Sequence, residues 1–254
     1  MAILYDLDQT ALRGRRVAVL GYGAQGHAHA LNLRDSGADV VVGLRPGAAR
    51  HGDAVAAGFE VQTSRSAVRA AEFVAMLVPD EAMAAVYAEI EPGLARRAAL
   101  VFAHGFALHY GQLAPRSDLD ALLVAPKGQG RTVRSAFETG RGVPAIVSAH
   151  RDATGKGRER ALAYAGALGC GRAGVIEATV GQETEADLFS EQAVLCGGVT
   201  QLVRTGFEVL VEAGYPPEVA YFECLHELKL VVDLLHDGGL VGMHRGISNT
   251  AEFG

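Results

Sequence analysis

The first 150 residues alternate short apolar runs with segments in which apolar residues recur every three or four positions. The apolar runs are rich in valine, alanine and leucine and span 16–23, 39–45, 73–79, 99–105, 120–128 and 143–150. Their length and composition are typical of buried strands. The segments with helical periodicity are 25–37, 66–72 and 80–90. Strands that alternate with helices predict a parallel sheet covered on both faces, with right-handed crossovers.

The pattern changes near residue 180. From there to residue 236 no strand pattern remains, and helical periodicity predicts two helices, over 186–213 and 216–237. Gly197 and Gly198 interrupt the first, and the prolines of "GYPP" suit the start of the second. The sequence therefore predicts an α/β domain over 1–180 and an all-α domain over 181–254.

Composition and charge exclude several classes of protein. An apolar fraction of 49% and a charged fraction of 20% are typical of a soluble globular protein. The net charge of −6, with no dense basic cluster, argues against a nucleic-acid partner. No run of about 18 apolar residues and no signal pattern occurs, so we predict neither a membrane segment nor secretion.

Three cysteines, Cys170, Cys196 and Cys224, form no CxxC motif. Cys196 and Cys224 lie in apolar helical patterns, so we expect both to be buried free thiols. Free thiols fit a reducing compartment, which favours a cytoplasmic location.

A glycine motif lies between the first strand and the first helix. "VAVLGYGAQGHAHAL" contains Gly21, Gly23 and Gly26 in the spacing G-x-G-x-x-G, with Gln25 inside it. In this strand–helix context the motif is typical of dinucleotide binding. Gly21 permits the tight turn, Gly23 lets a pyrophosphate approach the backbone, and Gly26 allows close helix–strand packing. The alternative is that the glycines only shape a turn. The motif predicts a Rossmann-type domain with Gly21, Gly23, Gln25 and Gly26 at the cofactor.

The end of the second predicted strand bears on which cofactor is bound. Enzymes that use NAD usually place an acid there for the ribose 2′-hydroxyl, whereas "VVVGLRPGAAR" has no acid and offers Arg45 and Arg50. A guanidinium can bind a 2′-phosphate with charge-assisted hydrogen bonds. We therefore predict NADPH, with NADH less favoured. The alternative is that both arginines are solvated loop residues.

Two acidic pairs interrupt apolar helical patterns. Asp187 and Glu191 are four residues apart, and so are Glu223 and Glu227, so each pair projects from one helix face. Like charges at this spacing repel, and four of them together need solvent, protons or cations. An all-oxygen ligand set suits Mg²⁺ or Mn²⁺, and four acids suffice for two metal ions. The alternative is that each pair is an ordinary solvated helix face.

Six stretches, in order along the chain, resemble one known family. They are "GYGAQGHAHALNLRDSG", "FAHGFALHYGQ", "VAPKGQG", "ETEADLFSEQAVLCGG", "AYFECLHELKLVVDL" and "ISNTAEFG". Together they look like ketol-acid reductoisomerase (acetohydroxyacid isomeroreductase) of the short, bacterial-type class. The resemblance implies an NADP-binding Rossmann domain over 1–180 and a knotted-type helical metal and substrate domain over 181–254. Family members continue for several helices beyond the position of Gly254, so we expect an incomplete, truncated helical domain and impaired cover of the site.

The resemblance also implies a reaction. The family converts 2-acetolactate or 2-aceto-2-hydroxybutyrate to the 2,3-dihydroxy-3-methyl acid on the route to valine, leucine and isoleucine. The first step is a Mg²⁺-dependent alkyl migration, and the second is hydride transfer from NADPH to the resulting 2-ketoacid. The implied cofactors are NADPH and two Mg²⁺ ions, and the implied assembly is a homodimer or higher homo-oligomer.

Residue roles follow from the matched motifs. Asp187 matches the carboxylate that bridges two Mg²⁺ ions, and Glu191 matches a ligand to one of them. Glu223 and Glu227 match the acids of the second helix, which in short-class dimers come from the partner subunit. We assign proton transfer to Glu227. Ser248 matches a residue that binds the substrate carboxylate.

His104 and Lys127 match active-site residues on the nucleotide-binding domain. Each follows a predicted strand, so both are expected at the carboxyl edge of the sheet, where doubly wound folds bind ligands. Lys127 can stabilise a developing oxyanion or order water. The alternatives are a structural role for His104 and a phosphate or metal-water contact for Lys127. We expect His27 and His29, in the first helix, to serve packing or to lie beside the cofactor.

The sequence departs from the family pattern at two places, and two other hypotheses stay open beside the resemblance. Ala48 stands where many members have a serine for the 2′-phosphate, and "PKGQGRT" replaces "PKGPGHT". One alternative is a metal-free β-hydroxyacid-type dehydrogenase, although such an enzyme is expected to use a lysine on its helical domain. The other is a catalytically impaired NADP-binding or oligomerisation module.

Overall fold

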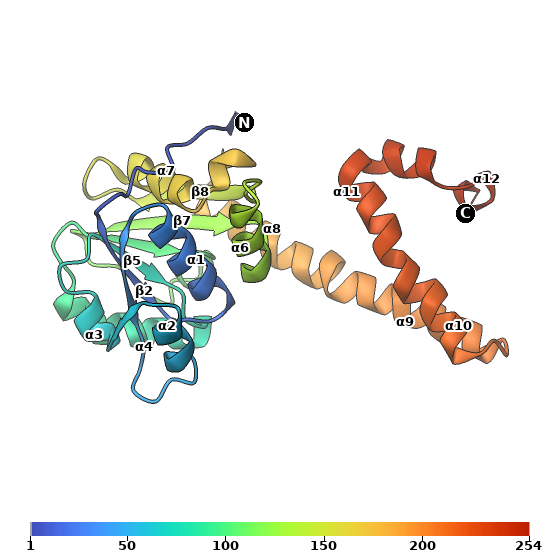
Figure 1. The fold of residues 1–254 in the computed structure, drawn as a ribbon, viewed down its shortest axis with the longest axis horizontal. Coiled ribbons are helices and arrows are strands. Elements are labelled where there is room, and N and C mark those ends of the chain that lie inside the picture. Colours follow the sequence, from blue (N-terminus) through green and yellow to red (C-terminus); the bar gives the residue numbers. More distant parts are fainter. Residues whose placement is uncertain (1, 254) are drawn as a thin grey trace. The chain divides into compact units, whose positions relative to one another are not determined.

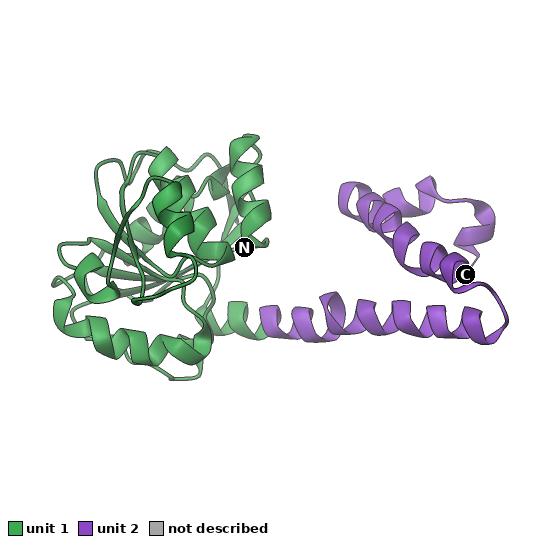
Figure 2. Ribbon diagram, turned by 60° about the horizontal axis from the view of Figure 1, so that its bottom comes forward, with its two compact units in different colours: residues 1–185 green, residues 186–254 purple. Residues whose placement is uncertain are grey.

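The protein divides into two compact units. The computed structural model describes residues 2–253, so Met1 and Gly254, which the predicted domain ranges include, lie outside the described residues. The units comprise residues 1–185 and 186–254 (Figure 2). Helix α8 (Val180–Phe189) runs through the point of division.

A nine-stranded sheet forms the centre of unit 1, in the order β1-β9-β8-β7-β6-β5-β2-β3-β4 (Figure 1). The strands are β1 (Ile3–Leu4), β2 (Arg16–Leu20), β3 (Asp39–Gly43), β4 (Glu60–Gln62), β5 (Phe73–Met76), β6 (Ala99–Phe102), β7 (Asp120–Pro126), β8 (Ala145–Arg151) and β9 (Val175–Glu177). The strands from β4 to β7 pair in parallel. The chain reverses its direction of winding between β2 and β5, which creates the crevice where doubly wound sheets bind ligands.

Helices cover both faces of this sheet. They are α1 (Ala24–Asp35), α2 (His51–Ala56), α3 (Ser64–Ala67), α4 (Asp80–Ile90), α5 (Phe106–His109), α6 (Gly130–Glu138) and α7 (Gly157–Ala167), with short 3₁₀ turns η1 (Glu91–Gly93) and η2 (Cys170–Arg172). Alternate residues of β2 enter different cores: Val17 and Val19 one, Ala18 and Leu20 the other. Burial on both faces explains why the strands appear in the sequence as unbroken apolar runs.

The Rossmann-type α/β fold and the helical C-terminal region are confirmed, but the sheet is not parallel throughout. β8 pairs antiparallel with β7, and β1 pairs antiparallel with β9. The connection through α6 contacts α1 and returns the chain to the edge where β7 ended, so β8 runs the opposite way. Strands β1, β4 and β9 span only two or three residues each, too short to give a pattern of their own.

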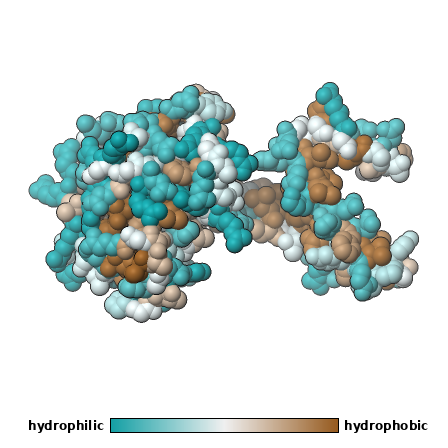
Figure 3. Space-filling model, in the orientation of Figure 1, coloured by the Kyte–Doolittle hydropathy of each residue, from teal (hydrophilic) through white to brown (hydrophobic). Residues whose placement is uncertain are grey.

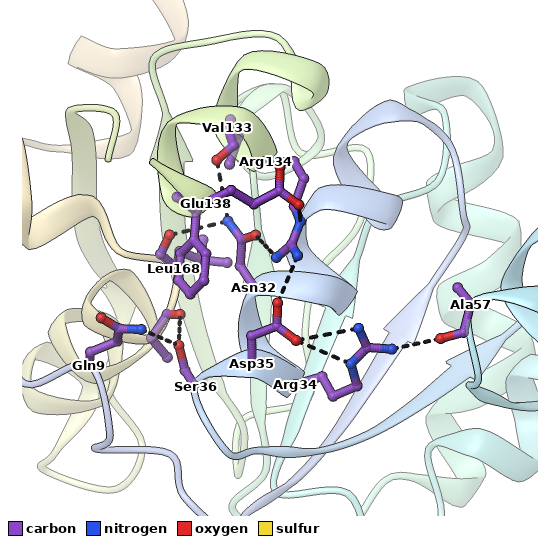
Figure 4. A network of polar contacts seen from close by, with 12 residues as sticks. Gln9, Asn32, Arg34, Asp35, Ser36, Ala57, Val133, Arg134, Glu138 and Leu168 are labelled. Atoms are coloured by element: carbon purple, nitrogen blue, oxygen red, sulfur yellow. Dashed lines mark hydrogen bonds and ion pairs between the residues drawn. The ribbon is translucent and has the colours of Figure 1, made fainter. Parts of the chain in front are cut away.

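A polar network ties α1 to its neighbours (Figure 4). The fully buried Asn32 donates to the carbonyls of Val133 and Leu168, at 3.4 and 3.3 Å, and accepts from Arg134 Nη1 at 2.9 Å. Ser36 Oγ donates to the carbonyl of Ala167 at 2.7 Å. These bonds fix the helix whose first turn contains Gly26, the last glycine of the motif.

Unit 2 consists of helices that bury almost nothing among themselves. Its elements are the rest of α8, then η3 (Ser190–Leu195), α9 (Gly197–Glu212), α10 (Pro217–Tyr221), η4 (Phe222–His226), α11 (Glu227–Gly246) and α12 (Asn249–Glu252). Both η3 and η4 are π-helical. The two predicted helices are present, and α9 begins at Gly197, where the break was expected. The second helix continues past its predicted end to Gly246, with a non-helical Gly239 inside it.

Apolar side chains lie on the surface of unit 2, as the brown atoms over its helices indicate (Figure 3). Leu202 is 72% exposed and Leu195 62%, whereas Ala220 is buried. The expectation that Cys196 and Cys224 are buried is therefore wrong: Cys196 is exposed and Cys224 half-buried. Their helices are amphipathic, and many apolar side chains among residues 186–253 are exposed. Cys170, in unit 1, is buried, and burial raises the pKa of its thiol to about 12.

The helical stretch Val180–Glu212 is long and apolar enough to cross a bilayer by length and composition alone. None of its most apolar window is buried within the described chain. Charged and polar residues interrupt its apolar run, so the sequence pattern did not predict a membrane segment here.

Candidate active site

The glycine motif has the geometry that its sequence predicts. Gly21 has a φ of +92°, and a Cβ on it would lie 2.3 Å from the Leu77 carbonyl oxygen. A Cβ on Gly26 would lie 2.3 Å from the carbonyl oxygen of Gly21, so the helix can approach the strand only without a side chain there. A Cβ on Gly23 would meet nothing within 4 Å, which leaves open space beside the backbone. The turn and the close approach both require glycine.

The N-terminus of α1 faces a cleft suited to a dinucleotide. Its N-cap, Gly23, makes no capping hydrogen bond, so the first N–H groups of the helix remain available to an anion. The cleft has a volume of about 580 Å³ and lies at the carboxyl ends of β2, β3, β5 and β6. The predicted cofactor residues among its lining are Gly21, Gly23, Gln25 and Arg45.

Gln25 connects this cleft to the loop after β7. Its Nε2 donates to the carbonyl of Gly128 at 2.9 Å, while its buried Oε1 has no hydrogen-bond partner among residues 2–253. The Gln25 side chain thus joins the glycine loop to the loop after β7, and its Oε1 is an acceptor without a partner among the described residues.

The two predicted phosphate-binding arginines occupy different surroundings. Arg45 lines the cofactor cleft. Arg50 instead lines a second cleft, of about 570 Å³, and its Nη1 lies 2.9 Å from Asp53 Oδ2. The structure therefore does not bring Arg45 and Arg50 to one cleft.

His104 and Lys127 meet at the carboxyl edge of the sheet, through a residue that the sequence analysis did not single out. That residue is Glu183, on α8, whose side chain is 1% exposed. Lys127 Nζ donates to Glu183 Oε1 at 2.7 Å, and His104 Nδ1 lies 3.7 Å from Glu183 Oε2. Burial raises the pKa of Glu183, but His104 and Lys127 outweigh burial and hold that pKa below its usual value. Glu183 is thus a buried carboxylate stabilised by the Lys127 ammonium and by the neighbouring His104 imidazole.

The approach of α8 to the sheet depends on Gly105. A Cβ on Gly105 would lie 2.2 Å from Thr184 Oγ1 and 2.7 Å from a methyl carbon of Val180. The glycine after His104 therefore lets the first turns of α8 pack against this edge and places Glu183 beside Lys127. The sequence signal for Glu183 was its position four residues before Asp187, which continues the acidic spacing by one helical turn.

Asp187 extends this cluster. His104, Glu183 and Asp187 each offer a possible metal-ligating atom, and these atoms lie within 4.8 Å of one another. The group combines two carboxylates with one imidazole, and Asp187 is only partly exposed. This donor chemistry fits a hard divalent cation, although the imidazole was not expected among the ligands.

The remaining predicted metal ligands are not part of this group. Among residues 2–253, no further set of three His, Cys, Asp or Glu side chains shares such a spacing. Glu191, Glu223 and Glu227 are exposed. The nearby cations are paired elsewhere, since Lys229 bonds Asp233 and Arg204 bonds Glu208. Lys229 and Arg204 are therefore not the partners of Glu223 and Glu227.

The remaining predicted residues have local roles. Ser248 is exposed and caps α12, its Oγ accepting from the Ala251 amide at 3.2 Å. His27 is exposed, whereas His29 is fully buried with its Nδ1 3.1 Å from the Tyr164 hydroxyl. The expectation that His29 serves packing fits this position.

Comparison with known families covers almost the whole chain. Residues 11–174 match acetohydroxy acid isomeroreductase, NADPH-binding domain, and residues 180–254 match ketol-acid reductoisomerase, C-terminal domain. The chain belongs to the ketol-acid reductoisomerase family. A solved structure of an NADH-preferring ketol-acid reductoisomerase from an uncultured archaeon is 46% identical, with a TM-score of 0.96. The match covers 100% of this chain and 79% of that one.

More distant structures share the fold alone. A semialdehyde dehydrogenase NAD-binding protein from Cupriavidus necator has a TM-score of 0.71 at 18% identity, over 94% of this chain and 88% of that one. The 3-hydroxyisobutyrate dehydrogenase of Mycobacterium tuberculosis has a TM-score of 0.53 at 17% identity, over 89% of this chain and 72% of that one.

Membership in the ketol-acid reductoisomerase family makes the chain an oxidoreductase with an isomerase step, in branched-chain amino-acid synthesis. It also decides against the hypothesis of a β-hydroxyacid-type dehydrogenase. The family match establishes a domain that binds a nicotinamide dinucleotide, and it does not distinguish NADPH from NADH.

Proposed function

We propose that the protein converts 2-acetolactate or 2-aceto-2-hydroxybutyrate to the corresponding 2,3-dihydroxy-3-methyl acid, with NADPH and Mg²⁺. The observation that carries this proposal is the cluster of His104, Lys127, Glu183 and Asp187, in a chain of this family. A buried carboxylate beside a lysine and a histidine is an arrangement that can hold and move protons at a reacting ketone.

The chain's own acids would hold the metal ions. We assign Asp187 and Glu191 as ligands from one chain, and Glu223 and Glu227 as ligands from a second copy, because the latter pair is exposed and outside the single-chain group. Two bound Mg²⁺ ions would polarise the ketone and stabilise the alkoxide of the neighbouring hydroxyl. The oxygen-rich donor set supports this choice of metal.

The remaining groups would orient the substrate and transfer protons. Lys127 would stabilise developing negative charge on the ketone oxygen, with its ammonium positioned by Glu183. His104 would exchange a proton or order water at the same edge, and Glu227 would transfer a proton from the partner chain. Ser248 would bind the substrate carboxylate.

NADPH is the proposed reductant, and Arg45 is the residue best placed to recognise its 2′-phosphate because it lines the cofactor cleft. The archaeal relative is described as NADH-preferring. At 46% identity that preference is a competing expectation for this chain, and an assay with both cofactors decides between them.

The proposal includes a homodimer or higher homo-oligomer in the cytoplasm, without a nucleic-acid or membrane partner. Its support is the uncovered apolar surface of unit 2, where a groove of about 420 Å³ is lined by side chains of α9 and η4 such as Phe207 and Leu225. Apolar surface of this kind is buried in stable assemblies.

The test is a paired assay of acetolactate turnover with NADPH and with NADH, each with and without Mg²⁺. We expect turnover to require Mg²⁺ and to be faster with NADPH. The variant Asp187→Asn should lose both partial reactions, because a metal-ligating charge is lost. Glu183→Gln should lower kcat by roughly 10²-fold or more, because Lys127 and His104 lose the charge that orients them.

Glu185→Gln is the matched control, since Glu185 is an exposed acid on the same helix. Binding of NADPH by all variants should be unchanged. Isomerase activity in Asp187→Asn at ordinary Mg²⁺ would refute the metal assignment. NADPH binding without any Mg²⁺-dependent turnover of the wild type would support the alternative of a catalytically impaired NADP-binding or oligomerisation module.

A further inference from the structure

The loop that follows β3 separates two clefts of unit 1. The cofactor cleft receives Arg45 and Ala48 from this loop, and the second cleft receives Arg50 and, from the first turn of α2, Asp53. Both clefts also share lining from the glycine motif, including Gly23. A side chain near the end of this loop can therefore face either cleft, depending on what it pairs with.

Arg50 is paired on the side of the second cleft. Its Nη1 lies 2.9 Å from Asp53 Oδ2, three residues later, with side chains 69% and 55% exposed. In contrast, no carboxylate forms an ion pair with Arg45 in the part of the chain that the structure describes, residues 2–253. One guanidinium of the loop is thus neutralised by a local acid, and the other is not.

This difference bears on cofactor choice. A 2′-phosphate is dianionic or nearly so, and a guanidinium that already binds a carboxylate has less charge and fewer donors to offer it. The carboxylate itself also repels the phosphate. An adenosine with a free 2′-hydroxyl meets neither effect. Asp53 therefore weakens binding of the phosphorylated cofactor relative to the unphosphorylated one.

We propose that Asp53 is a specificity-determining residue. By pairing with Arg50 it holds that side chain away from the cofactor cleft, and it thereby weakens the binding of NADPH relative to that of NADH. The inference rests on the proposed use of NADPH and names the residue that limits it. Recognition of the 2′-phosphate then falls mainly to Arg45, and Arg50 contributes only when its pair with Asp53 breaks.

The experiment is an equilibrium titration of the full chain with 2′,5′-ADP and with 5′-AMP, in the absence of Mg²⁺ and ketoacid. We expect Asp53→Asn to strengthen 2′,5′-ADP binding by roughly 1.5- to 5-fold, as suits the loss of an exposed pair, and to leave 5′-AMP unchanged. Arg45→Ala should weaken 2′,5′-ADP more than Arg50→Ala does. The control is Glu208→Gln, which removes a comparably exposed pair with Arg204, remote in sequence from the loop.

The double variant Arg50→Ala/Asp53→Asn separates positioning from simple charge repulsion. If Asp53 acts through Arg50, the gain of Asp53→Asn is absent in the Arg50→Ala background. A gain that persists there, no gain at all, or an equal gain for 5′-AMP overturns the proposal. Because the titration needs no turnover, an inactive reductoisomerase leaves this result readable. Equal wild-type affinity for the two nucleotides would count against NADPH preference, while the effect of Asp53→Asn still decides the role of Asp53.

Discussion

His29 is a fully buried histidine, and its surroundings change its pKa strongly. Burial lowers the pKa of His29 from 6.5 to about 3, and its Nε2 has no hydrogen-bond partner among the described residues. The folded protein therefore keeps the imidazole neutral, whereas the unfolded chain protonates it below a pH near 6.5. Because the unfolded state binds the extra proton, this residue destabilises the fold as pH falls from about 6.5 towards 3.

We predict that His29→Gln reduces the acid sensitivity of folding. At about pH 5 the wild type should lose roughly 2 kcal/mol of unfolding free energy, relative to about pH 7, through this one residue. The variant should lack that part of the slope, even if its stability at neutral pH is lower. Urea unfolding at several pH values measures it, with His27→Gln, an exposed histidine of the same helix, as the control. Equal pH slopes for the wild type and His29→Gln would contradict the prediction.

At the scale of elements, helix α1 positions the glycine motif at its N-terminus, and contacts near its C-terminus hold the helix in place. Asn32 connects it to α6 and to the end of α7 through two backbone carbonyls, and Arg134 joins Asn32 to α6 a second time. Buried polar groups of this kind are stabilising only while every partner is present. The network therefore couples the cofactor cleft to packing on the opposite side of the helix.

We expect Asn32→Ala to lower the free energy of unfolding by about 1–3 kcal/mol, because two buried carbonyls and a guanidinium lose a partner. Thermal and urea unfolding both measure the loss. Asn249→Ala, at an exposed asparagine, should stay within about 0.5 kcal/mol of the wild type. Cofactor affinity should fall along with stability in Asn32→Ala only if the helix moves. A stability equal to that of the wild type would show that the network contributes nothing.

The helices of unit 2 carry a second feature at this scale. Each acidic pair adjoins a π-helical segment: Glu191 lies within η3, and Glu223 lies within η4. π-Helical turns are rare and occur frequently at functional sites, because they change the direction in which a side chain projects. The four-residue spacing in the sequence therefore does not by itself give the relative orientation of the acids.

At the scale of the whole molecule, the described residues of unit 2 (186–253) form no hydrophobic core of their own. Exposed apolar residues line α9 and α11, and the stretch Val180–Glu212 also meets the length and composition of a membrane span. A second copy of the chain and a bilayer would each cover such a surface. The proposed second-copy position of Glu223 and Glu227 favours a protein partner.

We predict that Leu202→Asp shifts the protein from an oligomer towards a single chain, because Leu202 is 72% exposed on an apolar helix. Light scattering coupled to gel filtration, without detergent, gives the mass. The matched control is Val55→Asp, at an exposed apolar position of unit 1. We expect the wild type to have at least twice the mass of one chain. A wild-type protein that is monomeric, or soluble only in detergent, would count against the homo-oligomer.

Much of unit 1 could be predicted from sequence because its physics is local. The strands of the parallel sheet are buried on both faces, so they appear as apolar runs, and the glycine motif needs its spacing whatever surrounds it. Short edge strands such as β4 were not predicted, because two or three residues are too few to show a periodic pattern. The strand at β8 was predicted, but its antiparallel direction was not, because the direction of a strand depends on where the preceding helix packs.

Sequence alone determined the family, the Rossmann-type fold, the glycine motif and the acid spacing, since these follow from residue identity and from periodicity along one element. Only the tertiary structure decided that Glu183 joins Lys127 and His104, that Arg45 and Arg50 face different clefts, and that Cys196 is exposed. The reason is that burial and side-chain pairing depend on contacts between residues distant in sequence, and no local sequence pattern shows which residues come into contact.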